Sequence, residues 1–264
     1  MMTLISSFPQ TDKAAIRYVL ADIDDTLTIN GRLPAVAVGA MEALQAAGIR
    51  VIPITGRPAG WCDHIARMWP VDGLVGENGA FYFRYDPGSK RMLRRYWKSA
   101  AEREADRLRM DAIRQQVLAE VPGSAVAAEQ AYRETDLAID FCEDVPPLPL
   151  AEAEKIRAIF EEHGATAKIS SIHVNGWFGD YDKLTMTHIL FEEVFGEDLD
   201  AMRRQVVFCG DSPNDVPMFA FFPHSVGVAN VRRFAANMGT MPAWVTTAEG
   251  GIGFAEAVRV LLDK

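Results

Sequence analysis

The sequence predicts an α/β protein in which a parallel sheet covered by helices carries an inserted domain of the α+β type. From residue 17 onward, short apolar runs alternate with amphipathic stretches, as in strand-helix units around a parallel sheet. Between residues 84 and 179 this alternation gives way to strands joined by hairpins and single helices, which favours an antiparallel sheet. The length of 264 residues suits one large domain or a medium domain that carries a smaller one.

The first part of the predicted core contains three strands and two helices. Short apolar runs at residues 17–22, 49–54 and 72–75 are typical of buried strands. The stretches 34–47 and 58–69 are amphipathic, and each begins with a proline, a residue favoured in the first turn of a helix. The order strand, helix, strand, helix, strand predicts parallel pairing.

The middle of the chain has a different pattern. The turn sequence from Asp86 to Ser89 separates two strand-like runs and predicts a hairpin. Alternating and amphipathic stretches then predict an antiparallel sheet with two helices on one face. The predicted elements are strands at 81–85 and 92–97, a helix at 99–119, a strand at 136–142, a helix ending at 163, and strands at 166–169 and 171–178.

Strand-helix alternation returns after Gly179. Helices are predicted from residue 183 and at 216–221, with strands at 205–209 and 225–228. We therefore predict a core formed by residues 1–83 and 180–264, with residues 84–179 as the inserted domain.

The composition excludes several classes of protein. With 27 basic and 36 acidic residues the net charge is −9, and 49% of the residues are hydrophobic, so neither a disordered chain nor a nucleic-acid binder fits. No apolar run approaches the roughly 20 residues that cross a bilayer, and the N-terminus lacks the pattern of a secretion signal. Three widely spaced cysteines favour a reducing compartment. We expect a cytoplasmic protein, monomeric or homodimeric, without a nucleic-acid or membrane partner.

One local excess of positive charge lies in residues 84–109, with nine basic and four acidic side chains. Such a run is typical of the solvated face of a strand and a helix. Attraction of an anionic substrate is the alternative, and nucleic-acid binding is a weaker one.

Two acidic clusters follow predicted strands, at the edge where parallel α/β sheets bind ligands. The stretch from Asp22 to Asp25 holds three carboxylates, which repel one another unless a cation or a proton compensates them. Asp211, Asn214 and Asp215 follow a later strand and offer the hard oxygen ligands that Mg²⁺ prefers. Taken alone, each cluster also fits a turn or a helix cap.

Two further clusters suit an anion. Thr55, Gly56 and Arg57 follow a strand and precede a helix, so a hydroxyl and free backbone N–H groups form a cradle for a phosphate. Capping of the following helix by Thr55 accounts for the same residues. Lys183 opens a helix, and a single lysine is ordinarily a solvated surface charge.

In this order the four clusters resemble the motifs of the haloacid dehalogenase superfamily, most of whose members are Mg²⁺-dependent phosphatases. The similar features are D-x-D-D-T, a strand-terminal Thr, a helix-opening Lys and G-D-x-x-N-D. The resemblance spans nearly the whole chain, because the insertion is similar to the type IIB cap of Cof-like and sugar-phosphate phosphatases on a Rossmann-like core. The stretch Glu77 to Ala80 is similar to one found before that cap.

The resemblance implies a role for each cluster. Asp22 becomes the nucleophile that forms an aspartyl-phosphate, and Asp24 protonates the leaving alkoxide and then deprotonates the attacking water. Thr55 donates to a phosphoryl oxygen, and Lys183 offsets negative charge. Arg57 is either a substrate contact or a support for the helix end. Mg²⁺ is held by Asp22, the backbone carbonyl of Asp24, Asp211 and Asp215, with Asn214 in support.

The predicted cap strand at 171–178 carries a polar face. His173, Asn175 and Trp177 share it, and an imidazole, an amide and an indole suit a polyhydroxylated ligand, with Trp177 as a stacking surface. An exposed face on which Trp177 packs against a loop is the alternative. Since no second soft ligand lies near His173 in the sequence, we do not expect it to bind a metal.

The four ordered motifs and the resemblance they carry imply a Mg²⁺-dependent phosphomonoester hydrolase that acts through an aspartyl-phosphate on a small phosphorylated metabolite, a sugar phosphate by expectation. A phosphomutase of sugar phosphates and a catalytically silent module that binds a phosphorylated metabolite are the alternatives.

Overall fold

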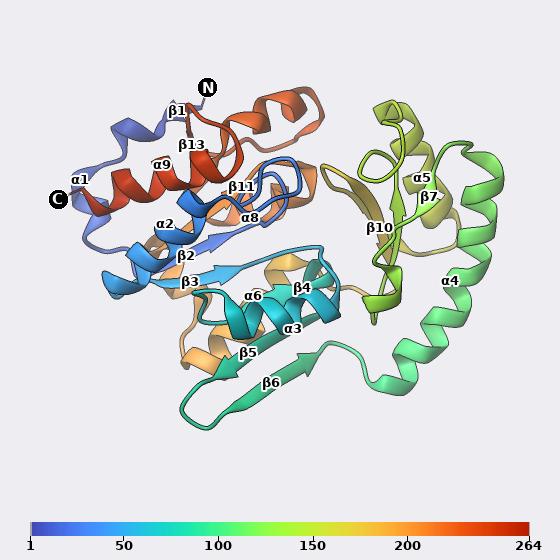
Figure 1. The fold of residues 1–264 in the computed structure, drawn as a ribbon, viewed down its shortest axis with the longest axis horizontal. Helices are drawn as coiled ribbons and strands as arrows, with labels where there is room; N and C mark the ends of the chain where they lie inside the picture. The colour runs from blue at the N-terminus through green and yellow to red at the C-terminus, as the bar shows by residue number, and fades with distance from the viewer. Residues whose placement is uncertain (1, 264) are drawn as a thin grey trace.

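A computed structural model describes residues 2–263, and Figure 1 shows a larger α/β part beside a smaller one. The larger part is built on a six-stranded sheet in the order β1-β13-β12-β11-β2-β3, and every pair in it is parallel. This confirms the predicted parallel core. Its strands are β1 (Thr3–Leu4), β13 (Trp244–Val245), β12 (His224–Gly227), β11 (Val206–Gly210), β2 (Tyr18–Ala21) and β3 (Arg50–Pro53).

Helices cover both faces of this sheet. On one face α2 (Ala35–Ala46) and α9 (Gly250–Leu262) pack against Val19 and Ala21 of β2. On the other face α6 (Lys183–Leu190) and α8 (Val216–Phe221) pack against Tyr18 and Leu20. Strand β2 is therefore buried on both sides, as the unbroken apolar run in its sequence predicts. Two short helices, α1 (Gln10–Lys13) and α7 (Leu199–Met202), complete this part.

The predicted hairpin lies beside the core sheet and not in the second sheet. Strand β4 (Leu74–Gly76) reaches the end of β3 through one parallel bridge between Ile54 and Val75. It pairs antiparallel with β5 (Phe81–Asp86), which pairs with β6 (Arg91–Tyr96). Phe81 and Phe83 of β5 stack on each other and share a buried cluster with α3 (Ala59–Met68), and this packing holds the hairpin. The proposed domain boundary at residue 84 therefore falls inside β5, and the predicted division of the chain stays a prediction.

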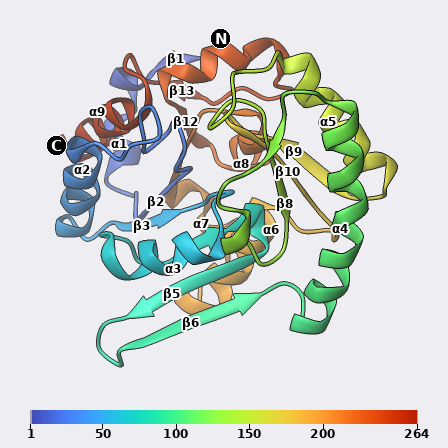
Figure 2. The same ribbon diagram turned by 45° about the vertical axis from the view of Figure 1, so that its right-hand side comes forward.

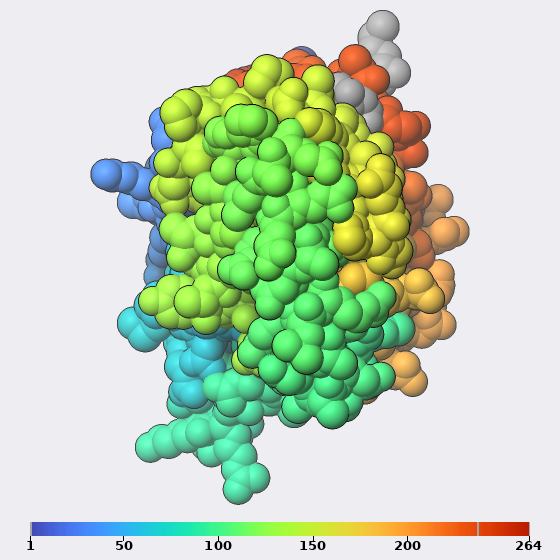
Figure 3. Space-filling model, turned by 90° about the vertical axis from the view of Figure 1, so that its right-hand side faces the viewer, coloured from blue at the N-terminus to red at the C-terminus, as the bar shows by residue number. Residues whose placement is uncertain are grey.

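The second part is a four-stranded antiparallel sheet in the order β7-β8-β10-β9, as predicted for the cap. Two helices lie on the side of this sheet that faces away from the core, and α4 runs across the outer surface (Figures 2 and 3). Ser99 and Glu102 form a capping box that begins α4. The elements are α4 (Ala100–Glu120), β7 (Ala125–Val126), β8 (Leu137–Asp140), α5 (Leu150–Glu162), β9 (Thr166–Ile169) and β10 (His173–Trp177).

Most predicted elements are present, with ends that shift by a residue or two. We predicted no element after residue 228, yet β13 and α9 lie there. Two-residue strands carry no periodic signal, and glycines at positions 250, 251 and 253 mask the beginning of α9, because glycine disfavours a helix. Within residues 2–263, no helix combines the length and apolar character needed to cross a bilayer.

Candidate functional site

Three carboxylates meet at the carboxyl edge of the parallel sheet. Asp22 follows β2 and Asp211 follows β11, and these neighbouring parallel strands bring both side chains to one edge. Asp215 ends the short 3-10 turn Pro213–Asp215. One oxygen from each of the three side chains lies within 4.8 Å of the others, and all three side chains are buried.

The first residue of α6 brings a cation into this cluster. The Nζ atom of Lys183 lies 3.2 Å from Oδ1 of Asp22 and 2.7 Å from Oδ1 of Asp215. Asp182 caps the helix by accepting the N–H of Thr185 at 2.8 Å. Gly79, at φ +109°, lies so close that a Cβ atom there would be 2.0 Å from the carbonyl oxygen of Asp182. The turn that contains Gly79 therefore supports the helix end that holds the lysine.

Side chains and backbone around the cluster fix the carboxylates. Oδ1 of Asp211 accepts a hydrogen bond from the Thr26 hydroxyl, and Oδ2 accepts one from the Asn230 amide, both at 3.2 Å. Oδ2 of Asp215 accepts the N–H of Asp211 at 3.0 Å. Gly210 makes this possible, because a Cβ there would lie 2.5 Å from the same oxygen.

The charges of the cluster do not balance. Three carboxylates (Asp22, Asp211, Asp215) against one ammonium (Lys183) leave two negative charges in a buried site. Burial raises the pKa of Asp22 to about 8 although Lys183 opposes it, and burial together with Asp215 raises the pKa of Asp211. Hard oxygen donors and a deficit of two positive charges fit a divalent cation such as Mg²⁺. Three of the four predicted metal residues, Asp22, Asp211 and Asp215, thus converge in a way that could hold a metal.

The predicted anion cradle lies at the end of the neighbouring strand β3. Oγ1 of Thr55 accepts the N–H of Arg57 at 3.0 Å, and its hydroxyl proton is free to point elsewhere. The Gly56 carbonyl accepts a hydrogen bond from Arg133 of the cap at 2.8 Å, and a Cβ at Gly56 would lie 3.1 Å from the Asn78 amide nitrogen. Small size at position 56 therefore lets the loop lie between core and cap.

Arg57 joins the core to the cap. Its Nε and Nη2 atoms donate to the two oxygens of Asp24 at 2.8 Å, and its guanidinium lies 4.6 Å from the ring centre of Trp61. Nη2 also lies 2.6 Å from Oε1 of Glu143, a cap residue. The side chain therefore lies between Asp24 and the cap and does not support the end of a helix.

Core and cap enclose a very small cavity, of about 10 Å³. Room of this size accommodates on the order of one water molecule. Its lining includes the predicted residues Asp22, Asp24, Gly56, Arg57, His173, Asn175 and Asn214, together with Arg133.

The structure corrects the predicted role of Trp177. This side chain is buried, donates from Nε1 to the carbonyl oxygen of Tyr181 at 3.1 Å, and stacks on the Tyr181 ring. It does not line the cavity, because the chain after β10 folds back and covers it. His173 and Asn175 do line the cavity, and the Asn175 amide donates to Asp136 at 2.9 Å. Trp177 thus packs on the segment after β10, as in the alternative, but the face itself is buried and not exposed.

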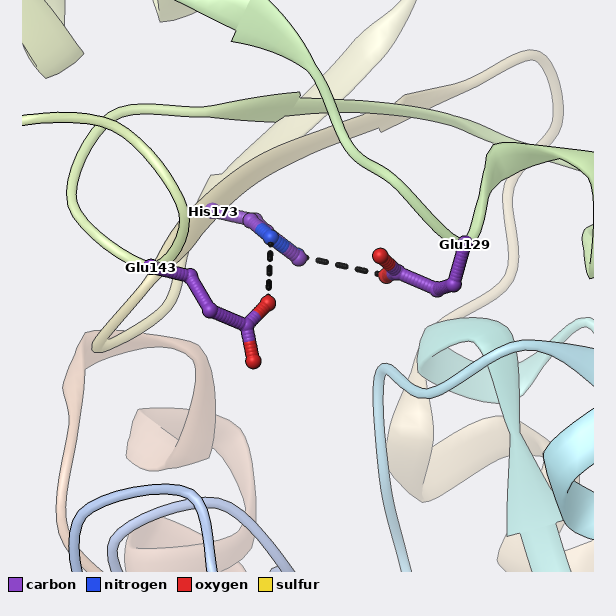
Figure 4. A group of neighbouring side chains, drawn as sticks. All are labelled: Glu129, Glu143 and His173. Atoms are coloured by element: carbon purple, nitrogen blue, oxygen red, sulfur yellow. Dashed lines mark ion pairs between the residues drawn. The ribbon is translucent and has the colours of Figure 1, made fainter.

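His173 has two acidic neighbours that its surrounding sequence does not reveal (Figure 4). Nε2 lies 2.9 Å from Glu143 and Nδ1 lies 3.6 Å from Glu129. The spacing of these three residues could hold an ion, yet Arg57 already pairs with Glu143, and Arg133 pairs with Glu129 at 2.6 Å. Against the raising effect of burial, His173 and Arg57 lower the pKa of Glu143 to about 2. Each carboxylate of the cap cluster therefore already has an arginine partner.

Glu77 forms a second buried joint between the two parts. Its side chain accepts the N–H groups of Ala59, at the start of α3, and of Glu134 and Thr135 in the cap, at 2.7–3.0 Å. Burial and the nearby Asp136 raise the pKa of Glu77 to about 7. The stretch that resembles a family motif is thus a structural link as well as a support for Lys183.

Several residues of the site were not predicted. These residues share no motif of fixed spacing. For those in the cap the one signal in the sequence is that charged residues flank the predicted strand at 136–142, whose alternate residues are apolar. They are Glu129, Arg133, Asp136 and Glu143 in the cap and Asn230 in the core.

The basic run at residues 84–109 is largely ion-paired. Six of its nine cations contact acidic side chains, which favours the solvated-face interpretation. They are Arg94, Arg95, Lys98, Arg103, Arg107 and Arg109.

Fold and site together define a class: a parallel α/β protein with an antiparallel cap and a buried carboxylate–lysine centre at the strand ends. Residues 19–118 match the family model of the haloacid dehalogenase-like hydrolases. A phosphoglycolate phosphatase of Methanoculleus marisnigri is 26% identical over 253 residues, which cover 92% of this chain and 96% of that one.

Two solved structures share the fold. The crystal structure of Thermoplasma acidophilum 0175 has a TM-score of 0.68 at 17% identity, over 93% of this chain and 98% of that one. A sugar phosphatase of haloacid dehalogenase subclass IIB has a TM-score of 0.61 at 16% identity, over 92% and 98%. Both likenesses extend over core and cap.

Proposed function

We propose that the protein is a Mg²⁺-dependent phosphomonoester hydrolase that acts through an aspartyl-phosphate on a small sugar phosphate. The observation that carries this proposal is the buried centre of Asp22, Asp211, Asp215 and Lys183, with its deficit of two positive charges. The names of two similar proteins, a phosphoglycolate phosphatase and a sugar phosphatase, support hydrolysis of a phosphate ester.

In this reaction, two in-line displacements replace one difficult hydrolysis. A carboxylate oxygen of Asp22 attacks phosphorus, the ester P–O bond breaks, and Asp24 gives its proton to the departing alkoxide. Asp24 then takes a proton from water as that water attacks the aspartyl-phosphate, which releases inorganic phosphate and frees Asp22.

The remaining residues bind and balance charge. Mg²⁺ would be held by Asp22, Asp211, Asp215 and the backbone carbonyl of Asp24, and it supplies neutralisation of the phosphoryl charge when bound. Lys183 offsets the charge of Asp22 and the phosphoryl group. Thr55 and the Gly56 loop donate to phosphoryl oxygens. Asn214 supports the turn that carries Asp215, because its side-chain oxygen accepts a hydrogen bond from the Ser212 hydroxyl at 2.8 Å.

Substrate binding requires the cap to open. The cavity of about 10 Å³ is far smaller than a sugar phosphate, so core and cap separate to admit one. The contact between Arg57 and Glu143 spans the two parts and breaks in that motion. Closure afterwards excludes bulk water from the reacting atoms. His173 and Asn175 line the cap side of the cavity and suit a hydroxylated leaving group.

The test is turnover of p-nitrophenyl phosphate and of a panel of sugar phosphates, with and without EDTA. We expect EDTA and Asp22→Asn each to abolish phosphate release, whereas Asp63→Asn, on the exposed surface of α3, retains it. Metal-independent turnover, or full activity in Asp22→Asn, would contradict the proposal. Transfer to a second sugar hydroxyl in the presence of a bisphosphate primer would identify a phosphomutase, and saturable Mg²⁺ binding without any turnover would identify a binding module.

A further inference from the structure

A series of polar contacts leads from Asp24 through the cap and back to the anion cradle. It runs from Asp24 to Arg57, Glu143, His173, Glu129, Arg133 and the Gly56 carbonyl. Every step is 3.6 Å or shorter, and the arginine and histidine side chains in it are at most 5% exposed. Besides Asp24, the core residues in this series are two neighbours in the chain, Gly56 and Arg57.

We propose that Glu143, fixed by His173, is a positioning residue that orients Asp24 through Arg57. This inference rests on the proposed function, in which Asp24 exchanges the proton of the leaving group. Neither Glu143 nor His173 touches Asp24, so both act through the guanidinium.

The flat guanidinium of Arg57 links the position of Glu143 to that of Asp24. A guanidinium is flat and presents its N–H groups along fixed directions, so a partner on one edge sets the angle of the other edge. Nε and Nη2 hold Asp24, while Nη1 and Nη2 face Glu143 at 3.3 and 2.6 Å. Trp61 lies under the plane at 4.6 Å and prevents the group from tilting. Loss of Glu143 leaves only the longer contact of Nη1 with Glu129, at 3.7 Å, on that edge and lets Arg57 rotate.

Glu143 itself lies on a loop that hydrogen bonds to Asp140 organise. The buried side chain of Asp140 accepts the N–H groups of Cys142, Glu143 and Asp144 at 2.8–2.9 Å. Nε2 of His173 lies 2.9 Å from the second carboxylate oxygen of Glu143. A loop organised in this way delivers a carboxylate to a defined place when the cap closes. Asp24 therefore reaches its working orientation only in the closed protein.

The test is a series of aryl phosphates that differ in leaving-group basicity, measured as kcat/KM with Mg²⁺ present. Nitrophenolate departs without a proton, whereas phenolate needs one, so the slope against basicity reports the proton from Asp24. We expect Glu143→Gln to lower kcat/KM for phenyl phosphate about tenfold and for p-nitrophenyl phosphate less than about twofold. The exposed cap variant Glu161→Gln leaves the slope unchanged, and Arg57→Lys, which keeps the charge but loses the fork, steepens it as Glu143→Gln does.

Opposite results separate the two proposals. A parallel fall across the whole series in Glu143→Gln, or no fall, would overturn the positioning role, because lost binding or lost folding changes all the esters alike. Thermal melting of each variant checks folding. If the unaltered protein hydrolyses no aryl phosphate, the proposed function fails, and the positioning role fails with it.

Discussion

Residues 2–263 contain two groups of three possible metal ligands, one buried throughout and one with the half-buried Glu143, and the two groups differ in charge. Asp22, Asp211 and Asp215 in the core and Glu129, Glu143 and His173 in the cap each satisfy the same distance limit of 4.8 Å. In the core one lysine faces three carboxylates. In the cap Glu143 and Glu129 each pair with an arginine, Arg57 and Arg133, although these arginines also pair with Asp24 and Asp136.

By the distances between their ligands the two groups are alike, and the pairing of their charges is what distinguishes them. A buried carboxylate is costly unless a cation compensates it, and in the cap the protein supplies those cations itself. In the core it leaves two charges for a ligand to neutralise. The origins differ as well, because the core ligands follow parallel strands, whereas the cap ligands come from loops and from the start of β10.

The largest expected effect comes from removing the one cation of the core group. Lys183→Met leaves the buried carboxylates without their internal partner, and we expect kcat to fall about 10²- to 10³-fold. The exposed cap lysine variant Lys155→Met is the matched control and keeps its activity. Steady-state kinetics measure kcat for both variants. If Lys183→Met retained more than about a tenth of the activity, Lys183 would not be needed to offset the charge of the core carboxylates.

The stability that Glu77 contributes through its contacts between core and cap is expected to depend on pH. Since burial raises the pKa of Glu77 from 4.5 to about 7, its proton binds more tightly in the folded protein. The resulting stability is fully present below about pH 4.5 and is lost as the pH rises through about 7, by up to about 3 kcal/mol.

Glu77→Gln keeps this position neutral and flattens the dependence. Urea unfolding at about pH 5 and about pH 8 measures it, with exposed Glu104→Gln as the control. Equal pH dependence in Glu77→Gln and in the unaltered protein would show that this carboxyl does not titrate in the joint.

Metal binding should stabilise the core group more at high pH. The raised pKa values of Asp22 and Asp211 mean that protons compensate these carboxylates in the metal-free protein at low pH. This stabilisation is lost as the pH rises, for Asp22 through about 8. Mg²⁺ competes with those protons, so at about 100 times its dissociation constant it adds about 2.7 kcal/mol once they are gone. Thermal melts with Mg²⁺ or EDTA at about pH 5.5 and about pH 8 should show the larger shift at the higher pH. The same shift at both values, or in Asp211→Asn, would count against a metal in this group.

The smallest effect is expected in the cap. Glu129→Gln removes one carboxylate from a group already compensated by Arg133, so the affinity for Mg²⁺ should change by less than about twofold. Calorimetric titration with Mg²⁺ measures this. A marked loss of affinity would mean that distance, and not charge balance, identifies the metal site.

Much of the fold and half of the site follow from local patterns. The core strands were predicted because both faces of a parallel strand are buried, as in β2 and β11, where every residue is apolar or glycine. Asp22, Asp211 and Lys183 were predicted because they occupy ends of such elements. Glu143 and Glu129 were not, because they lie in irregular segments with no periodicity. Trp177 shares the alternation of His173, yet the fold of the chain after β10 buries it.

The sequence by itself determined which side chains gather at the strand ends, because neighbouring parallel strands end at one edge whatever the rest of the chain does. Only the tertiary structure decided how the charges pair. Arg57 and Glu143 lie 86 residues apart in the chain, and they meet because the cap folds over the core, which buries Arg57 and leaves Glu143 half-buried. Pairing of this kind depends on the geometry with which two units pack, and no spacing of residues along the chain encodes it.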